Sequence, residues 1–117
     1  VTTSANGGGS GTSESSAWTL KEAFSKANAG MTVWIKAGNY GNENISLRRD
    51  GNAVNPIKFV GYKNSNGDIS SNYFDYGVTW STSEMPTLTG SSASNGHAIQ
   101  LIGTNYVVFR NLQITNY

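Results

Sequence analysis

The apolar residues of this chain follow a two-residue period in a series of short runs. In "TVWIK", Val33 and Ile35 alternate with residues that are polar or suited to an outward position. A period of two is that of a β-strand with one buried face. Each run therefore predicts a short strand that turns two apolar side chains inward. The period recurs at Ile45 and Leu47, Ile57 and Phe59, Ile99 and Leu101, Val107 and Phe109, and Leu112 and Ile114.

The residues between these runs indicate how the strands are arranged. Gly, Asn and Ser, which favour turns, separate one run from the next. Strands this short do not easily form the core of a β-sandwich. They suit a coil that bends every few residues and stacks each turn on its neighbours. The chain after Gly30 is therefore expected to be all-β and built from stacked turns.

One segment has the period of a helix instead. In "WTLKEAFSKANAG", Thr19 and Glu22 form the pattern of a capping box, and Trp18 stands where a hydrophobic staple against Ala23 would form. Gly30 is placed to end the helix in a left-handed conformation. We expect a single amphipathic helix over residues 20–29. Its apolar stripe consists of Leu20, Ala23, Phe24 and Ala27.

The 117 residues are enough for one small domain with a modest core. Residues 1–17 are polar and Gly-rich, which predicts a flexible lead-in or a loop pinned at its edges. Residues 18–30 contain the helix, and residues 31–117 contain the strands. Within them, residues 63–85 break the two-residue period and are expected to form a long loop. This loop carries Tyr73, Phe74, Tyr76 and Trp80.

The composition limits which kinds of binding partner and which kinds of site the chain can have. Lys and Arg number 8 against 7 Asp and Glu, so charge gives no reason to expect nucleic acid or an anionic membrane as a partner. There is no cysteine, which excludes disulfides, zinc-thiolate sites and thiol nucleophiles. No apolar run approaches the roughly 20 residues that cross a bilayer. A start at Val1 without a leader is what a processed secreted protein would show, and a trimmed sequence would show the same.

Several stretches together resemble a known family. They are "WTLKEAFSKANAGMTVWIKAGNYGNENISL", "NPIKFVGY", "PTLTG" and "HAIQLIGTNYVVFRNLQITNY". They are similar to the start of secreted right-handed parallel β-helix proteins of the pectate-lyase-like superfamily, especially its chondroitinase-B and alginate-lyase branch. The resemblance implies a helix at residues 20–29 that caps the coil, a turn at Ala37, Gly38 and Tyr40, and a later turn at residues 106–115. It covers nearly the whole chain from Trp18 onward.

The resemblance implies the N-terminal portion of a uronate-polysaccharide lyase. The chain would hold about two to three turns at the 20 or more residues per repeat expected of such solenoids. Met31 departs from the family, which commonly has an acidic residue before the first strand. The catalytic turns would lie beyond this segment. The segment itself would carry no cofactor, and Ca²⁺ is a candidate cofactor of a full-length lyase.

No catalytic set can be identified in these residues. A lyase needs a cation to neutralise the uronate carboxylate and a positioned base. Lys36, Lys58 and Arg110 are interpreted as solvated, outward-facing side chains. His97, the sole histidine, is interpreted as a turn or surface residue. The alternation in "NSNGD" at Asn64, Asn66 and Asp68 is interpreted as an Asx-rich turn, because it lacks the further carboxylates of a strong calcium site.

Two other features are candidate sites. Sugar rings stack on Tyr and Trp, so Tyr73, Tyr76 and Trp80 could form a carbohydrate platform. The alternative is that these rings fold back over the flank of the coil and shield it. "NIS" at Asn44 matches an N-glycosylation acceptor.

The final segment, "NYVVFRNLQITNY", raises a separate question. It predicts a strand, a bend and a strand at the end of the coil opposite the helix, so the last turn has no cap or partner. One hypothesis is that the chain opens a longer secreted protein that acts on or binds polysaccharide. The alternative is a structural subunit of an extracellular filament or adhesin, in which further copies assemble head-to-tail.

Overall fold

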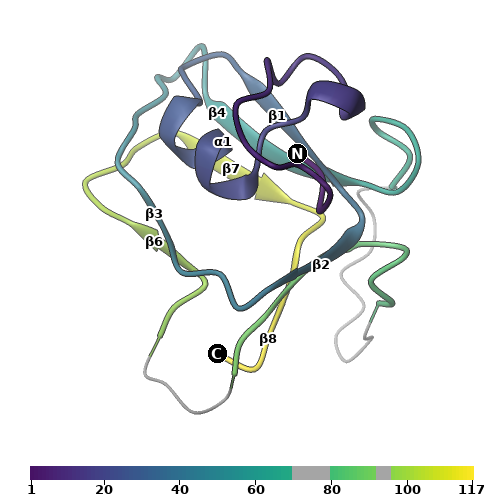
Figure 1. The fold of residues 1–117 in the computed structure, drawn as a ribbon. Coiled ribbons are helices and arrows are strands. Elements are labelled where there is room, and N and C mark those ends of the chain that lie inside the picture. Colours follow the sequence, from purple (N-terminus) through teal and green to yellow (C-terminus); the bar gives the residue numbers. More distant parts are fainter. Residues whose placement is uncertain (70–79, 92–95) are drawn as a thin grey trace.

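The structure is a computed structural model that describes residues 1–69, 80–91 and 96–117. Most of its regular structure is β-strand, with one α-helix (Figure 1). The described elements, in chain order, are a short 3₁₀ turn η1 (Glu14–Ser16), α1 (Leu20–Lys26), β1 (Thr32–Lys36), β2 (Gly38–Gly41), β3 (Ile45–Leu47), β4 (Ile57–Tyr62), β5 (Pro86–Thr89), β6 (Ile99–Leu101), β7 (Val107–Arg110) and β8 (Gln113–Thr115).

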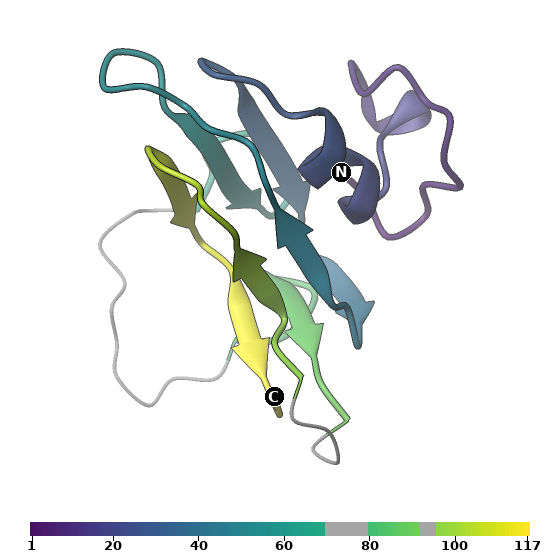
Figure 2. The same ribbon diagram turned by 90° about the vertical axis from the view of Figure 1, so that its left-hand side faces the viewer.

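All strand pairings among the described residues are parallel, and each of β1 to β5 pairs with the third strand after it. The chain forms three separate sheets in the orders β1-β4-β7, β2-β5-β8 and β3-β6. Consecutive strands therefore belong to different sheets, and after β3 the chain returns to the first sheet, where β4 lies beside β1. Figure 2 shows α1 and the N-terminal segment on one side of this stack and β6, β7 and β8 on the other. The expectation of short strands stacked on their neighbours is confirmed to this extent: the fold is mostly strand, with parallel sheets.

The core lies between the sheets and contains many of the predicted alternating positions, together with the apolar stripe of the helix and with Leu88 and Ala98, which the alternation did not predict. Val33, Ile35, Ile45, Leu47, Ile57 and Phe59 are all buried. Three phenyl rings stack through the core: the ring of Phe24 lies 4.5 Å from that of Phe59, which lies 5.2 Å from that of Phe109. These separations are close to the spacing of about 4.8 Å between neighbouring strands. The ring stack therefore ties α1, β4 and β7 together along the direction of stacking.

The predicted helix forms, but it is shorter than expected. Thr19 and Glu22 form the capping box, and the four residues of the apolar stripe are buried. The helix ends at Lys26, however, because Ala27 is extended (φ −61°, ψ 134°). The prediction that Gly30 ends the helix is wrong. Gly30 does have a positive φ of 84°, but it lies in the following turn, where its N–H donates to the carbonyl of Asn55.

The turn expected at Ala37, Gly38 and Tyr40 is also wrong. Only Ala37 lies at a bend, and the next four residues form β2, which pairs with β5. Gly and Asn disfavour strands, so the sequence of β2 does not reveal it. Pairing with β5 supplies the strand geometry, and the Tyr40 hydroxyl donates to the carbonyl of Lys36 across the bend at 2.8 Å.

The last pass of the chain buries less than the alternation predicts. Leu101 and Ile114 are 51% and 48% exposed, although their ladder partners Leu47 and Leu88 are buried. The reason is that β6, β7 and β8 are the last strands of their sheets, and no described strand covers their free edges. We call the surface formed by Leu101, Tyr106, Ile114 and Tyr117 the open face. All four side chains are at least 36% exposed.

The N-terminal segment is pinned to the edge of β1 and to α1 by polar contacts. The carbonyl of Val1 accepts from the Lys36 N–H at the edge of β1, and the Trp18 indole donates to the carbonyl of Gly9. The carboxylate of Glu22 accepts from the N–H groups of Gly8 and Thr19 at 2.7 and 2.8 Å. Glu22 thus caps α1 and holds the segment that precedes it. Among the described residues, no helix is long and apolar enough to cross a membrane.

Close stacking of successive layers requires glycine beneath two bends of the last pass. Asn111 and Asn116 have positive φ values of 56° and 57°. Each directs its carbonyl oxygen at a glycine one layer below, Gly61 and Gly90 respectively, and a Cβ on either glycine would overlap that oxygen. Neither glycine has a positive φ, so the constraint is the available space.

We expect Gly61→Ala to destabilise the fold by about 3 kcal/mol, since the new methyl group would force β4 away from the bend at Asn111. Urea unfolding followed by circular dichroism measures this. The matched control is Gly67→Asn, at a residue with φ of 84° and no neighbouring atom within 4 Å. It should cost about 1 kcal/mol, because Asn tolerates the left-handed region. Equal losses for the two variants would contradict the close approach.

The pH dependence of stability tests the double role of Glu22. The N–H groups of Gly8 and Thr19, aided by Lys26, hold the pKa of Glu22 at about 2, below its ordinary 4.5. A depressed carboxyl pKa stabilises the folded state above the unfolded pKa, and this stabilisation is lost as pH falls through the folded pKa. Glu22→Gln should therefore lower the free energy of unfolding at pH 7, and the deficit should shrink between about pH 4.5 and pH 2.

Thermal unfolding across this pH range, with Glu84→Gln as control, checks the expectation. Glu84 accepts from a single hydroxyl, that of Ser81. A Glu22→Gln deficit that is the same at pH 7 and pH 2.5 would show that the charge of the carboxylate contributes nothing.

Candidate functional site

The outer surface of the sheet β1-β4-β7 carries an aromatic ring beside two cations. Because side chains alternate along a strand, the buried residues Val33 and Phe59 place Trp34, Lys58 and Val60 on the outside. The parallel register sets Trp34 opposite Val60, and Val60 opposite Arg110. Trp34 and Arg110 therefore lie in one row across the sheet, and Lys58 lies in the adjacent row. We call Trp34, Lys58, Val60 and Arg110 the Trp34 face.

The Trp34 face is hollowed by a cavity of about 480 Å³. Its remaining walls come from the loop after β4, through Gly67 and Ile69, and from Thr32 and Asn111. The volume lies in the range of ligand-binding pockets, which is roughly 300–1,000 Å³. The cavity is open to solvent. Its floor is the sheet β1-β4-β7, in which the central strand β4 is hydrogen-bonded on both sides, so the floor is held in place.

The loop over this cavity is held by one carboxylate. Asp68 accepts from the N–H groups of Lys63, Asn64 and Ser65 at 2.7, 2.7 and 3.0 Å. These hydrogen bonds lower the pKa of Asp68, so that it stays charged. The interpretation of this segment as an Asx-rich turn is confirmed. Because its oxygens already accept three amides, Asp68 closes the loop.

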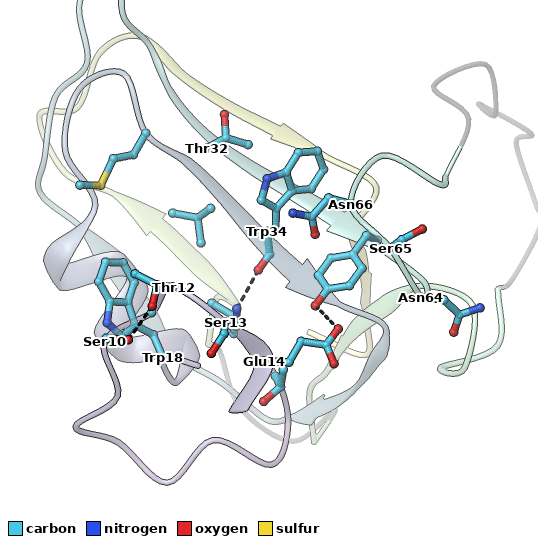
Figure 3. A pocket seen from close by; sticks show the side chains of 16 residues that line it. Ser10, Thr12, Ser13, Glu14, Trp18, Thr32, Trp34, Asn64, Ser65 and Asn66 are labelled. Atoms are coloured by element: carbon cyan, nitrogen blue, oxygen red, sulfur yellow. Dashed lines mark hydrogen bonds between the residues drawn. The ribbon is translucent and has the colours of Figure 1, made fainter. Parts of the chain in front are cut away.

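The ring of Trp34 is itself supported from one side. The ring of Tyr62 meets it edge-on at 6.5 Å between centroids. The Tyr62 hydroxyl donates to Glu14 at 2.9 Å (Figure 3). The other oxygen of Glu14 accepts from the Lys36 ammonium at 2.6 Å. Burial of the Tyr62 phenol raises its pKa to about 12, and the hydrogen bond to Glu14 and the charge of Glu14 add to this effect. The phenol therefore stays protonated and keeps its hydrogen bond, which fixes the tyrosine against Trp34.

A second cavity of about 570 Å³ lies on the N-terminal side of Trp34. Figure 3 shows the N-terminal segment forming one wall and Asn64 and Asn66 lying on the opposite side. We call this the N-terminal hollow. It shares Thr32 and Trp34 with the cavity of the Trp34 face, so one indole borders both.

The arrangement on the Trp34 face is suited to binding an acidic sugar. An indole offers a flat apolar surface for the face of a sugar ring. An ammonium and a guanidinium form charge-assisted hydrogen bonds with carboxylates, and the guanidinium can engage one through two parallel bonds. Neither Lys58 nor Arg110 has an ion-pair partner among the described residues. Both cations are thus available to a ligand.

The predicted site residues lie elsewhere or outside the described residues. Tyr73 and Tyr76 are among the residues that the structure does not describe, so the carbohydrate platform stays a prediction. Trp80 is half-buried, and its backbone N–H and carbonyl bond the side chain of Gln113 in β8 at 2.8 and 3.0 Å. Asn44 is exposed directly before β3. The structure does not bring Trp80 and Asn44 together.

The described residues contain no constellation for metal or triad chemistry. His97 is exposed before β6, and it has no hydrogen bond to a serine or aspartate in the described part of the chain. Asp50 instead accepts from the N–H of Asn105 at 2.7 Å. Across residues 1–69, 80–91 and 96–117, no three His, Asp or Glu side chains gather as metal ligands would.

Sequence reasoning missed the Trp34 face for an identifiable reason. The alternation in "TVWIK" already places Trp34 outward between two buried residues, and an outward Trp is a signal of binding. Lys58 and Arg110 are 52 positions apart in the sequence. The pairing of β1 with β4 brings Lys58 beside Trp34, and the pairing of β4 with β7 adds Arg110. Each one taken singly is no more than a solvated side chain.

Comparison with known proteins adds no relative to this picture: the chain matches no family model, no curated protein and no solved structure. The function of the chain is therefore inferred from two surfaces, the Trp34 face and the open face.

Proposed function

We propose that this chain is the helix-capped N-terminal portion of a secreted right-handed parallel β-helix protein that binds or acts on a uronate polysaccharide. The Trp34 face is the part of the polysaccharide-binding surface that these residues supply. The resemblance to the chondroitinase-B and alginate-lyase branch makes a polysaccharide lyase the most similar kind of enzyme, with its catalytic turns outside this chain. The observation that carries the proposal is the row of Trp34, Val60 and Arg110 beside Lys58, over a hollow of about 480 Å³.

The strand order supports the β-helix part of the proposal. Three parallel sheets in which neighbouring strands are always three strands apart in the sequence are what a coil of three strands per turn produces. The ring stack of Phe24, Phe59 and Phe109 fills the inside of that coil, with the helix at one end. The carbonyl of Asn111 lies directly against Gly61. This is expected if the bend at Asn111 is stacked on the equivalent position of the preceding turn.

The open face supports the placement within a longer coil. Leu101 and Ile114 continue the buried ladder positions of Leu47 and Leu88. Apolar side chains at unpaired strand edges favour pairing with another strand. A further parallel turn would cover all of them with the same spacing and register that the first turns use.

The alternative function, a filament or adhesin subunit, is favoured by the same exposed side chains. Its head-to-tail form requires the open face to meet the helix-capped end of another copy. The outer surface of α1 carries Lys21, Ser25 and Lys26, all exposed. Burying these polar groups against apolar side chains is unfavourable, so this contact is poorer than one with a further turn.

The carbohydrate proposal predicts binding that depends on the Trp34 face. We expect Trp34→Ala to weaken binding of an oligogalacturonate about tenfold, since ring stacking contributes on the order of 1 kcal/mol beyond the buried area. Lys58→Gln and Arg110→Gln should each weaken it by a similar factor, because each removes a charge-assisted hydrogen bond. Isothermal titration calorimetry at low and high salt measures all three effects.

Lys21→Gln is the matched control, because it removes an exposed cation on α1 that does not line the cavity of the Trp34 face. It should leave the dissociation constant unchanged. If no uronate oligosaccharide binds the parent chain, or if Lys21→Gln weakens binding as much as Lys58→Gln, the Trp34 face is not the site.

The open face makes a second, independent prediction. The 117-residue chain should self-associate as its concentration rises, and Leu101→Arg with Ile114→Arg should suppress this association. Val54→Arg is the control, because Val54 is 85% exposed and lies before β4. Sedimentation velocity gives the masses, and electron microscopy separates small assemblies from filaments. Long filaments abolished by the paired variant would support the subunit alternative over the lyase-like one.

A further inference from the structure

The two hollows that border Trp34 differ in charge, and this difference concerns the chemistry of the ligand. The Trp34 face carries Lys58 and Arg110. The N-terminal hollow is lined by apolar residues such as Trp18, Met31 and Val33, by uncharged hydroxyl and amide groups, and by one carboxylate, that of Glu14. The uncharged polar lining residues include Ser10, Thr12, Ser13, Asn64, Ser65 and Asn66.

The charge of Glu14 is already balanced inside the protein. Its carboxylate accepts from the Lys36 ammonium and from the Tyr62 hydroxyl, and these contacts lower the pKa of Glu14, so it stays ionised. Lys36 is thereby engaged. The amino group of Val1 is half-buried and donates to the carbonyl of Trp34 at 2.7 Å. A carboxylate placed in this hollow would meet the carboxylate of Glu14, whose partner cation Lys36 is already engaged.

The amides in the hollow, by contrast, have spare hydrogen-bonding capacity. The side chains of Asn64 and Asn66 are exposed and bond to no other described residue. Their backbone is fixed, because Asp68 holds the N–H groups of Asn64 and Ser65. Primary amides donate and accept at once, which suits sugar hydroxyls and N-acetyl groups. The indole of Trp34 offers its flat surface to the same space.

We infer that the N-terminal hollow is a subsite for a neutral sugar, and that Trp34 is shared between this unit and the acidic unit bound by Lys58 and Arg110. The ligand is then a heteropolysaccharide in which neutral units adjoin uronates. A polymer of uronates alone would place a carboxylate beside Glu14. This inference rests on the proposed uronate binding at the Trp34 face and adds the identity of the adjoining unit.

Two hexasaccharide probes test the inference on the 117-residue chain. One is an oligogalacturonate, acidic at every unit, and the other is a hyaluronan hexasaccharide, in which glucuronate alternates with a neutral N-acetylated sugar. Calorimetry should show the hyaluronan probe binding about tenfold more tightly. Asn66→Ala should remove most of this preference by weakening only the hyaluronan probe, whereas Lys58→Gln should weaken both. Asn42→Ala, at an exposed asparagine before β3, should change neither.

A second measurement locates the neutral unit directly. In ¹⁵N-labelled protein, the hyaluronan probe should shift the backbone amides of Asn64 and Ser65 and the indole N–H of Trp34, whereas the oligogalacturonate should shift the Trp34 indole without the two loop amides. If neither probe binds, the proposed function fails. If both bind equally and Asn66→Ala affects neither, uronate binding stands and the neutral subsite is wrong.

Discussion

The stack of Phe24, Phe59 and Phe109 is the contact on which the rest of the fold depends. Its rings are separated by 4.5 and 5.2 Å, close to the strand spacing of about 4.8 Å. Rings at this spacing pack only if β4 and β7 stay in register, since a shift of one residue would turn Phe109 to the solvent. The same register places Arg110 opposite Val60 on the outer surface. The core therefore decides which side chains meet outside, and the Trp34 face is a consequence of packing between the sheets.

Local signals in the sequence were sufficient for the elements that bury their own apolar residues. The alternation at Val33 and Ile35 and the capping box at Thr19 and Glu22 correspond to β1 and α1. The sequence was not sufficient where a partner strand supplies the structure. β2 contains two glycines and an asparagine in four residues, and it is a strand because β5 lies beside it. Likewise, burial of Leu101 and Ile114 depends on what covers β6 and β8, which alternation within a strand does not encode.

The candidate site shows the same division. That Trp34 points outward follows from its two buried neighbours, and that the segment after β4 turns sharply follows from Asn and Asp near Gly67. The cluster itself depends on long-range pairing, because Lys58 and Arg110 approach each other only through the register of β4 with β7. The position of Glu14 depends on the path of the polar N-terminal segment, whose contacts with Lys36 and Tyr62 have no signature in the sequence.

The two sides of Trp34 also differ in how they are held, and this has a consequence for recognition. The cations stand on strands in the middle and at the edge of a hydrogen-bonded sheet, so their backbone is fixed before a ligand arrives. The wall opposite is a segment attached by an ion pair and by single hydrogen bonds, at Glu14, Gly8 and Trp18. Exposed ion pairs contribute little to stability, so this wall can adjust at small cost. Affinity is then expected to come from the cations on the rigid strands, and discrimination between neighbouring sugar units from Asn64 and Asn66 on the loop that Asp68 holds, while the N-terminal segment adjusts to the bound unit.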